Sequence, residues 1–251
     1  MTTGTIFLVG AGPGDADLLT LRAARLLGQA SLIVHDGLVD DSVLALANPD
    51  AQLISVAKSR SQHTLPQEEI NALLVREAMA GRDVVRLKGG DPFIFGRGGE
   101  EMEAAHAAGV PVEVVPGISA ANGAAAAAQI ALTHREASSI VSFVAGQCKG
   151  LADQNWAGLA GVGRTLVIYM GVKTAPQIAE KLMADGLAPE MPVAVIENGA
   201  RYDMRVLRGS LASLPEIVER EAVKSPALIV IGEVTARTDV ALAQTALEAA
   251  Q

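Results

Sequence analysis

Short apolar runs alternate with segments of helical periodicity along the first half of the chain. This alternation is typical of strands and helices that follow one another in an α/β sheet. Helices are predicted from Asp17, as N-cap, to about Leu27, over Pro66–Met79 and over Glu100–Ala108. The predicted strands are Thr5–Val9, Ser31–His35, Leu53–Val56, Asp83–Leu87 and Val110–Val115.

The same alternation restarts after residue 135. Each half is long enough for a domain, so the pattern predicts two α/β domains, residues 1–135 and 136–251, each with a mixed or mostly parallel sheet. Arg205–Gly209 could form a further strand in a hairpin with Val193–Asn198. The other predicted elements are strands at Ile140–Ala145, Thr165–Met170, Val193–Glu197 and Ala227–Ile231, and helices at Ala175–Asp185, Leu214–Glu221 and Thr238–Gln251.

Each predicted strand of the first half is followed at its carboxyl end by a polar or glycine-rich loop. Open parallel sheets bind ligands at that edge. The longest such stretch, Arg86–Glu101, holds five glycines, three cationic side chains and three carboxylates in sixteen positions. A plain polar loop rarely carries this load of charge and glycine. The stretch is therefore predicted to be a ligand site.

Composition narrows the kind of ligand. The 251-residue chain is half apolar, has a net charge of −8 and contains one cysteine, Cys148. A nucleic-acid surface needs a basic face, so nucleic acid is not expected as a partner. One cysteine excludes internal disulfides and multi-cysteine metal sites, which favours a reducing compartment, here the cytoplasm. Because multi-cysteine metal sites are excluded, a bound metal is not expected either. The apolar stretch Ile118–Leu132 is too short to span a bilayer, so a membrane is not expected as a partner.

The glycine loop after the first strand invites comparison with a dinucleotide fingerprint. Gly10, Gly12 and Gly14 follow the strand, and Asp36 ends the next one. The fingerprint needs its third glycine at position 15, which is Asp15, and Pro13 removes a backbone donor. A nucleotide-dependent oxidoreductase or an ordinary nucleoside-fold methyltransferase is therefore disfavoured. By themselves, Asp36 could be a simple turn residue and Lys58 a solvated loop lysine.

Five segments taken together resemble the tetrapyrrole methylases. They are Gly10-Ala-Gly-Pro-Gly-Asp15 with Leu18-Leu-Thr-Leu21, Val85–Glu101, Val115–Ala121, Leu132-Thr-His-Arg135 and Tyr169-Met-Gly171. The resemblance runs in order through nearly the whole chain and is strongest to the branch that methylates uroporphyrinogen III.

This resemblance implies two α/β domains with a deep cleft between them, a homodimer, and S-adenosylmethionine as methyl donor. The implied reaction is C-methylation of uroporphyrinogen III at C2 and C7, giving precorrin-2 through precorrin-1 for sirohaem or cobalamin-type cofactors. A methyltransferase that acts on a later precorrin is the alternative, which the complete Phe93–Glu101 motif disfavours.

The resemblance also implies roles for single residues. Asp36 matches the family's proton acceptor and Lys58 its proton donor, and Arg97, Glu100 and Arg135 match positions against the tetrapyrrole. The implied cofactor-binding residues are Pro13, Gly89, Gly90, Asp91, Ile94, Ser119, Ala120, Met170 and Gly199.

These residue types suit the implied chemistry. Alignment of the two reactants should supply most of the acceleration, and a carboxylate should stabilise the pyrrolic cation or remove its proton. Glu100 is preferred to Asp36 for that role because it lies beside Arg97 in the central motif. The substrate carries many carboxylates, for which Arg97 and Arg135 are natural bidentate clamps.

Some positions depart from the family pattern. Gly37 and Ser59 stand where arginines are usual, and Gln129 begins a Gln-Ile-Ala segment in place of Gly-Ile-Pro. These changes weaken the roles expected of Asp36 and Lys58 but leave the cofactor motifs intact.

Overall fold

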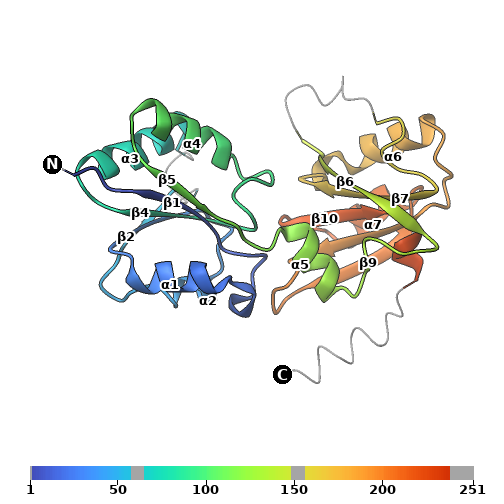
Figure 1. The fold of residues 1–251 in the computed structure, drawn as a ribbon. Helices are drawn as coiled ribbons and strands as arrows, with labels where there is room; N and C mark the ends of the chain where they lie inside the picture. The colour runs from blue at the N-terminus through green and yellow to red at the C-terminus, as the bar shows by residue number, and fades with distance from the viewer. Residues whose placement is uncertain (1, 58–64, 148–155, 238–251) are drawn as a thin grey trace. The chain divides into compact units, whose positions relative to one another are not determined.

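The computed structural model describes residues 2–57, 65–147 and 156–237. The chain divides into two compact units, Met1–Ala120 and Ala121–Gln251 (Figure 1). The domain boundary expected at residues 135 and 136 stays a prediction. The expectation of an α/β fold is confirmed, because each unit contains one five-stranded sheet with helices.

The sheet of the first unit is entirely parallel. Its strand order is β3-β2-β4-β1-β5. The central strand β4 is buried at all five positions, as expected for a parallel strand covered on both faces. The strands are β1 (Ile6–Gly10), β2 (Leu32–His35), β3 (Gln52–Ser55), β4 (Val84–Lys88) and β5 (Val112–Val115).

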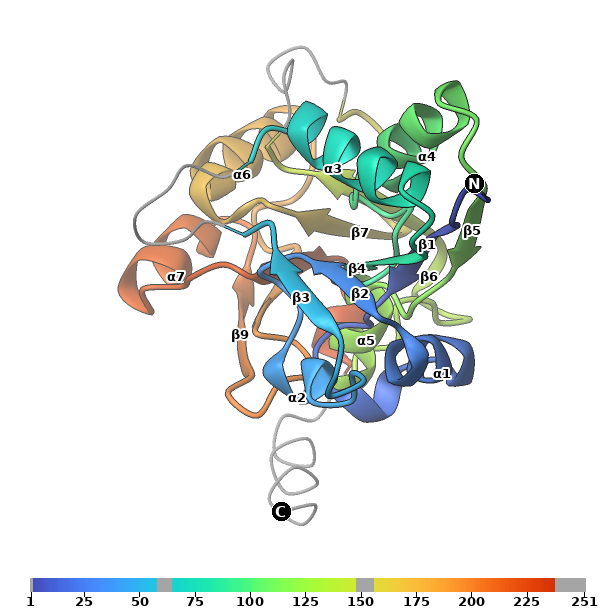
Figure 2. The ribbon, with the colours of Figure 1, turned by 90° about the vertical axis from the view of Figure 1, so that its left-hand side faces the viewer.

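Helices cover both faces of this sheet. Figures 1 and 2 show α3 (Gln67–Met79) and α4 (Gly98–Ala107) on one face, with α1 (Leu21–Gln29) and α2 (Asp41–Leu44) on the other. Alternate residues of each strand point to opposite faces, which gives two apolar cores. Ile6 and Leu8 pack with α3 and α4, whereas Val9 packs with α1 and α2.

The sheet of the second unit is mixed, with the order β6-β7-β10-β8-β9. β6 and β7 are parallel, and β10 pairs antiparallel with both β7 and β8. The predicted hairpin is confirmed by antiparallel pairing of β8 with β9. The elements are α5 (Ala120–Ala127), β6 (Ser138–Ala145), β7 (Gly163–Tyr169), α6 (Ala175–Ala184), β8 (Pro192–Glu197), β9 (Arg205–Ser210), α7 (Leu214–Arg220) and β10 (Ala227–Ile231).

Local hydrogen bonds correct the predicted start of the first helix. Asp15, not Asp17, caps a 3₁₀ turn at Ala16–Leu18 by accepting a bond from the backbone N–H of Asp17. The α-helix starts later, where the Thr20 hydroxyl accepts a bond from the backbone N–H of Ala23. Asp15 and Thr20 divide the segment into two caps because both side chains can bond to backbone two or three residues ahead.

The remaining helices compare with the predictions as follows. The helix expected from Glu100 begins two residues earlier, at Gly98, and the short helix α2 was not expected. The C-terminal helix predicted over Thr238–Gln251 lies outside the described residues. Within the described part of the chain, no helix is both long and apolar enough to cross a bilayer.

Candidate functional site

Backbone hydrogen bonds join the loops that follow β1 and β4. The N–H of Ala11 donates to the carbonyl of Lys88 at 2.7 Å. Gly12 and Gly90 exchange two bonds, with N···O distances of 3.2 and 2.7 Å. Because β1 and β4 are neighbours in the sheet, these bonds extend the pairing past the strand ends. The two loops therefore leave the sheet as one connected layer.

Close backbone packing adds the loop after β5 to this layer. A Cβ atom on Gly117 would lie 2.3 Å from the carbonyl oxygen of Gly90. One on Gly10 would lie 2.5 Å from the backbone nitrogen of Gly117. Side-chain atoms do not approach backbone that closely, so these positions require glycine. The glycines allow three loops to meet at the carboxyl edge of the sheet, where α/β proteins bind ligands.

The side chain of Asp91 links two of these loops through hydrogen bonds. Its Oδ1 accepts a bond from the backbone N–H of Phe93 at 2.9 Å, and its Oδ2 accepts one from that of Gly117 at 3.1 Å. Both carboxylate oxygens are thus engaged by backbone donors, an arrangement typical of an aspartate that shapes a turn. Asp91 was predicted to bind the cofactor, and the geometry gives it a second role in fixing the shape of the loops.

The remaining cofactor candidates of the first unit lie around this layer. Pro13 is half-buried between Gly12 and Gly14. The backbone N–H of Ile94 donates to the carbonyl of Asp91, and the Ile94 side chain is partly exposed. Ser119 is buried, and a Cβ on Gly90 would lie 3.4 Å from the backbone nitrogen of Ala120.

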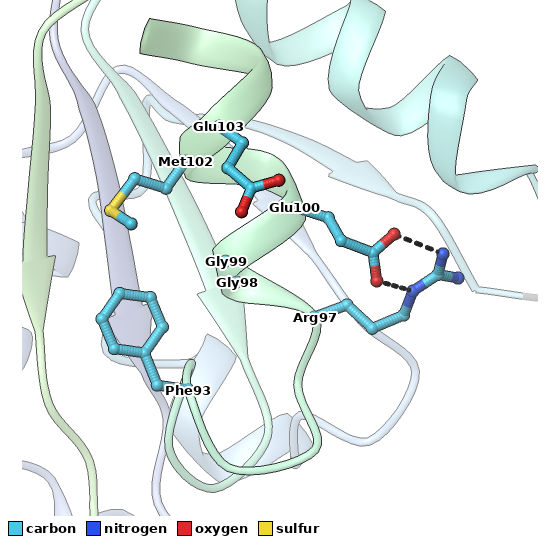
Figure 3. A pocket seen from close by; sticks show the side chains of 7 residues that line it. All are labelled: Phe93, Arg97, Gly98, Gly99, Glu100, Met102 and Glu103. Atoms are coloured by element: carbon cyan, nitrogen blue, oxygen red, sulfur yellow. Dashed lines mark hydrogen bonds and ion pairs between the residues drawn. The ribbon is translucent and has the colours of Figure 1, made fainter. Parts of the chain in front are cut away.

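A chain reversal between β4 and α4 brings charged and apolar side chains to one hollow. Phe95 and Arg97 have φ angles of 53° and 59°, and the N–H of Gly98 donates to the carbonyl of Pro92 at 3.0 Å. Non-glycine residues at positive φ cost about 1–3 kcal/mol each and gather at functional sites. The hollow of about 460 Å³ is lined by Phe93, Arg97, Gly98, Gly99, Glu100, Met102 and Glu103 (Figure 3).

Arg97 and Glu100 form an exposed bidentate ion pair at the rim of this hollow. The Nε–Oε1 and Nη2–Oε2 distances are 2.8 and 2.7 Å. About half of each side chain is accessible to solvent. The hydrogen bond from Arg97 lowers the pKa of the Glu100 carboxyl, and the same bond raises the pKa of Arg97. In Figure 3 the pair extends to one side of the start of α4, whereas the side chains of Phe93 and Met102 lie on the other side.

A second, buried group of charges lies beneath the same segment. Arg86 donates from Nε to Oε1 of Glu101 and from Nη2 to Oδ1 of Asp36, at 2.9 and 2.5 Å. Lys88 Nζ lies 2.9 Å from Glu101 Oε1 and 3.9 Å from Asp36 Oδ2. The side chains of Arg86, Lys88 and Glu101 are at most 2% exposed, whereas that of Asp36 is 29% exposed.

Burial changes the pKa of Lys88, one member of this group. Desolvation lowers the pKa of Lys88 below its ordinary 10.5, and the charge of Arg86 lowers it further. Asp36 and Glu101 act in the opposite direction by attracting the ammonium group. A buried cation with opposing influences of this kind is typical of functional sites as well as of structural ion pairs.

Sequence reasoning included Arg86, Lys88 and Glu101 in the central motif but assigned them no role. A signal was available, because Arg86 and Lys88 are two positions apart on a strand whose other residues are apolar. Residues two apart on a strand share one face, so both cations must enter the same core. The partner, Glu101, could not be recognised, since it lies on a helix whose packing is set by tertiary structure.

The second unit carries the other predicted site residues. Met170 directly follows β7 and has a φ of 55°, and its side chain is exposed. Gly199 lies between Asn198 and Ala200, whose φ angles are 51° and 60°. A Cβ on Gly199 would lie 2.3 Å from Cβ of Ala124. Arg135 is exposed in the turn before β6. Lys58 lies outside the described residues.

The donor set favours a neutral or zwitterionic organic ligand over a metal. In the described ranges, no group of three or more histidine, cysteine, aspartate or glutamate side chains could hold a metal ion. The loops of the first unit offer backbone amides and carbonyls, the buried hydroxyl of Ser119, and the apolar side chain of Ile94. A nucleoside with an amino-acid tail needs such a mixture of polar backbone and apolar surface.

The parallel sheet with a connected glycine layer at its carboxyl edge places the protein among α/β proteins that bind a small organic ligand there. The chain belongs to the tetrapyrrole methylases: the family model described as "Tetrapyrrole (Corrin/Porphyrin) Methylases" matches residues 5–215. This confirms the family resemblance noted in the sequence.

Individual relatives agree with this assignment. A siroheme synthase from Gluconacetobacter diazotrophicus is 51% identical over 93% of this chain and 50% of its own length. One from Tolumonas auensis is 53% identical over 94% of this chain and 50% of its own. The chain spans about half the length of the curated relatives it matches.

Solved structures have the same fold. A uroporphyrin-III C-methyl transferase from Thermus thermophilus, complexed with S-adenyl homocysteine, is 40% identical with a TM-score of 0.79, over 92% of this chain and 93% of that one. A cobalt precorrin-4 methyltransferase has a TM-score of 0.81 over 92% and 95% of the two chains, at 24% identity, and this likeness shows the fold alone.

Proposed function

We propose that this protein is an S-adenosylmethionine-dependent C-methyltransferase of uroporphyrinogen III. It methylates C2 and then C7, giving precorrin-1 and then precorrin-2 for sirohaem or cobalamin-type cofactors. The observation that carries the proposal is the 40% identity, over 92% of this chain, to the Thermus thermophilus enzyme in complex with S-adenyl homocysteine. The siroheme synthases at 51% and 53% identity support a role in sirohaem synthesis.

The cofactor-binding residues of the proposal are those predicted from the sequence. When bound, S-adenosylmethionine supplies an electrophilic methyl group. In the first unit Gly89, Gly90, Asp91, Ser119 and Ala120 would hold it, together with Pro13 and Ile94. In the second unit, Met170 and Gly199 are the residues proposed to bind it. The glycine layer supports this role because it brings backbone donors and acceptors to one edge without intervening side chains.

Arg97 and Arg135 are proposed to bind carboxylates of the tetrapyrrole. A guanidinium group matches a carboxylate through two parallel hydrogen bonds, which fixes the orientation of the substrate. Arg97 is already in bidentate geometry with Glu100, so a substrate carboxylate would compete with that partner. The half-exposed position of Arg97 keeps the cost of this exchange small.

Two carboxylates could take the proton that the methylated pyrrole must lose. Glu100, preferred from the sequence, has both oxygens bonded to Arg97 and a lowered pKa, which weakens it as a base. Asp36 bonds Arg86 through Oδ1, while its Oδ2 lies 3.9 Å from Lys88. We therefore propose Asp36 as proton acceptor and Glu100 as the group that stabilises the pyrrolic cation, with Lys58 as proton donor.

We further propose that the protein works as a homodimer in the cytoplasm. The single cysteine and the net charge of −8, which led to the expectation of a reducing compartment and no nucleic-acid partner, support this setting.

Mass analysis of the tetrapyrrole product tests the proposal. Purified protein is incubated anaerobically with uroporphyrinogen III and excess S-adenosylmethionine. We expect a gain of two methyl groups, and cofactor with a deuterated methyl group should shift the product mass by the corresponding amount. Bound S-adenosylhomocysteine with no methyl gain would reject uroporphyrinogen III and favour a later precorrin.

Single-turnover rates separate the two carboxylates. Asp36→Asn should lower the rate by about 100-fold or more, the lower range of general-base effects. Glu100→Gln should lower it less, because it removes charge stabilisation alone. An unchanged rate in Asp36→Asn would exclude Asp36 as proton acceptor, and an unchanged rate in Glu100→Gln would exclude any catalytic part for Glu100.

A further inference from the structure

Four charged side chains from β4, α4 and the end of β2 form a balanced cluster. Arg86 and Lys88 supply two positive charges, and Asp36 and Glu101 supply two negative ones. Arg86 is held further by its Nη1, which donates to the carbonyls of Val34 and Leu87 at 3.4 and 3.3 Å. This charge cluster therefore has fixed geometry deep in the first unit.

Asp36 is the one member of the charge cluster that reaches the surface. Its side chain is 29% exposed, while the other three are at most 2% exposed. Asp36 follows the last residue of β2, at the carboxyl edge of the sheet. The cluster thus extends from the core to that edge and ends in one accessible carboxylate.

Glu101 gathers the buried cations through a single oxygen. Its Oε1 accepts bonds from Arg86 Nε at 2.9 Å, Lys88 Nζ at 2.9 Å and Gln67 Nε2 at 3.3 Å. Its Oε2 is buried and has no hydrogen-bond partner among the described residues. An unsatisfied buried oxygen is costly, and such atoms in native proteins call for an explanation.

Stability alone does not explain the charge cluster. A buried ion pair gains little over an apolar core of the same volume, because desolvation offsets the attraction. What the cluster does provide is a rigid set of cations around one carboxylate. Arg86 fixes Asp36 Oδ1 at 2.5 Å, and Lys88 faces Oδ2 at 3.9 Å, beyond hydrogen-bond distance.

We propose that Arg86, Lys88 and Glu101 are positioning residues that hold the Asp36 carboxylate in the orientation needed for methyl transfer. Glu101 anchors the two cations, and the cations act on Asp36. Arg86 sets the direction of the carboxylate, and Lys88 supplies positive charge while leaving Oδ2 able to accept a proton. The inference rests on the proposed function of Asp36.

A double-mutant cycle tests this coupling. Lys88→Met, Asp36→Asn and the double variant are compared by kcat and by KM for uroporphyrinogen III. We expect Lys88→Met to lower kcat by about 10- to 100-fold, the loss that a displacement of about 1 Å can cause, with KM changed less than about 3-fold. In the Asp36→Asn background the same substitution should lower kcat by less than about 3-fold, because residues that act as a unit are not additive.

Two further variants serve as a rescue and a control for this cycle. Lys88→Arg keeps the charge and should recover most of the lost rate. Arg22→Met is the matched control, since it removes a cation from an exposed ion pair with Glu113 in the same unit. It should leave kcat unchanged in both backgrounds. Affinity for S-adenosylhomocysteine, measured by calorimetry, shows that each variant keeps its cofactor site.

The outcomes separate the possible failures. Equal losses from Lys88→Met in both backgrounds, or an unchanged kcat, would overturn the inference while an active wild type leaves the proposed function standing. An inactive wild type would overturn both. If Lys88→Met does not fold, Arg86→Lys serves instead, because it keeps the charge and shortens the reach to Asp36; additive losses with that variant would equally overturn the inference.

Discussion

Two ion groups from the same motif occupy opposite environments. Arg97 and Glu100 form a pair that is about half exposed on both sides, whereas Arg86, Lys88 and Glu101 are almost fully buried. The residue types and pair distances are alike, with N···O distances of 2.7 to 2.9 Å. Burial is the main difference between them.

The difference teaches which carboxylate can exchange partners. An exposed pair contributes little to stability and is screened by salt, so a ligand can replace one member. A buried group cannot lose one member without leaving an uncompensated charge. Glu100 and Glu101 are neighbours in sequence, yet the first suits ligand contact and the second suits a permanent scaffold.

The largest expected effect on stability concerns the buried group of Arg86, Lys88 and Glu101. Glu101→Ala leaves Arg86 and Lys88 with Asp36 as the one remaining carboxylate, and should lower the free energy of unfolding by about 3–5 kcal/mol. Urea-induced unfolding measures this value. Glu113→Ala, which breaks the exposed pair with Arg22, is the control and should cost about 0–1 kcal/mol. Equal losses of unfolding free energy in Glu101→Ala and Glu113→Ala would contradict the stated difference between buried and exposed ion pairs.

The next prediction concerns the two glycines that open α4, which carries both glutamates. A Cβ on Gly98 would lie 2.5 Å from the carbonyl oxygen of Pro92, whereas one on Gly99 would meet nothing within 4 Å. Gly98→Ala should therefore destabilise the protein by about 1–3 kcal/mol. Gly99→Ala should stabilise it by about 0.5–1 kcal/mol, because alanine is the better helix former. Thermal or urea unfolding that gave the same sign for both would contradict this assignment.

A third prediction concerns alkaline pH. The pKa of Lys88 is lowered by burial, so between that folded value and 10.5 the unfolded state binds more protons than the folded state. The free energy of unfolding should then rise with pH in that window, by up to about 1.4 kcal/mol per pH unit. Urea unfolding of the wild type and Lys88→Met should show this rise in the wild type alone.

Lys181→Met, on α6 of the other unit, is the matched control and should keep the wild-type slope. A rise that persists in Lys88→Met would assign the effect to other groups.

The smallest effect is expected at the exposed pair. Arg97 lowers the pKa of Glu100 through their hydrogen bond, so Arg97→Met should return that pKa towards 4.5. An NMR titration of the glutamate carboxyl carbons measures the change. The melting temperature should stay within error of the wild type, since both side chains remain solvated. A clear drop in melting temperature would show that the exposed pair is part of the scaffold.

Most of the fold could be predicted because its signals are local. Apolar runs at Ala227–Ile231 and Val193–Glu197 identified two strands, and the hairpin of β8 with β9 is confirmed. The first helix was misplaced because Asp15, Asp17 and Thr20 can all cap a helix, and only the folded chain selects among them.

The candidate site was predicted less evenly. The glycines of the central motif were recognised as a ligand site, but which backbone each one meets was not. Gly117 requires glycine because of Gly90, twenty-seven positions away, and no local pattern records that distance. The roles of Glu100, Asp36 and Lys58 stay predictions, and Lys58 lies outside the described residues.

The sequence by itself determined the order of strands and helices, the charged glycine-rich motif and its family, because these follow from periodicity and from residue types at fixed spacing. Only the tertiary structure decided which charges are buried and which are exposed. Asp36 and Arg86 are fifty positions apart and meet because β2 and β4 are adjacent in a parallel sheet. Burial is a property of that packing, and burial decides whether the same ion pair is a scaffold or a contact for substrate.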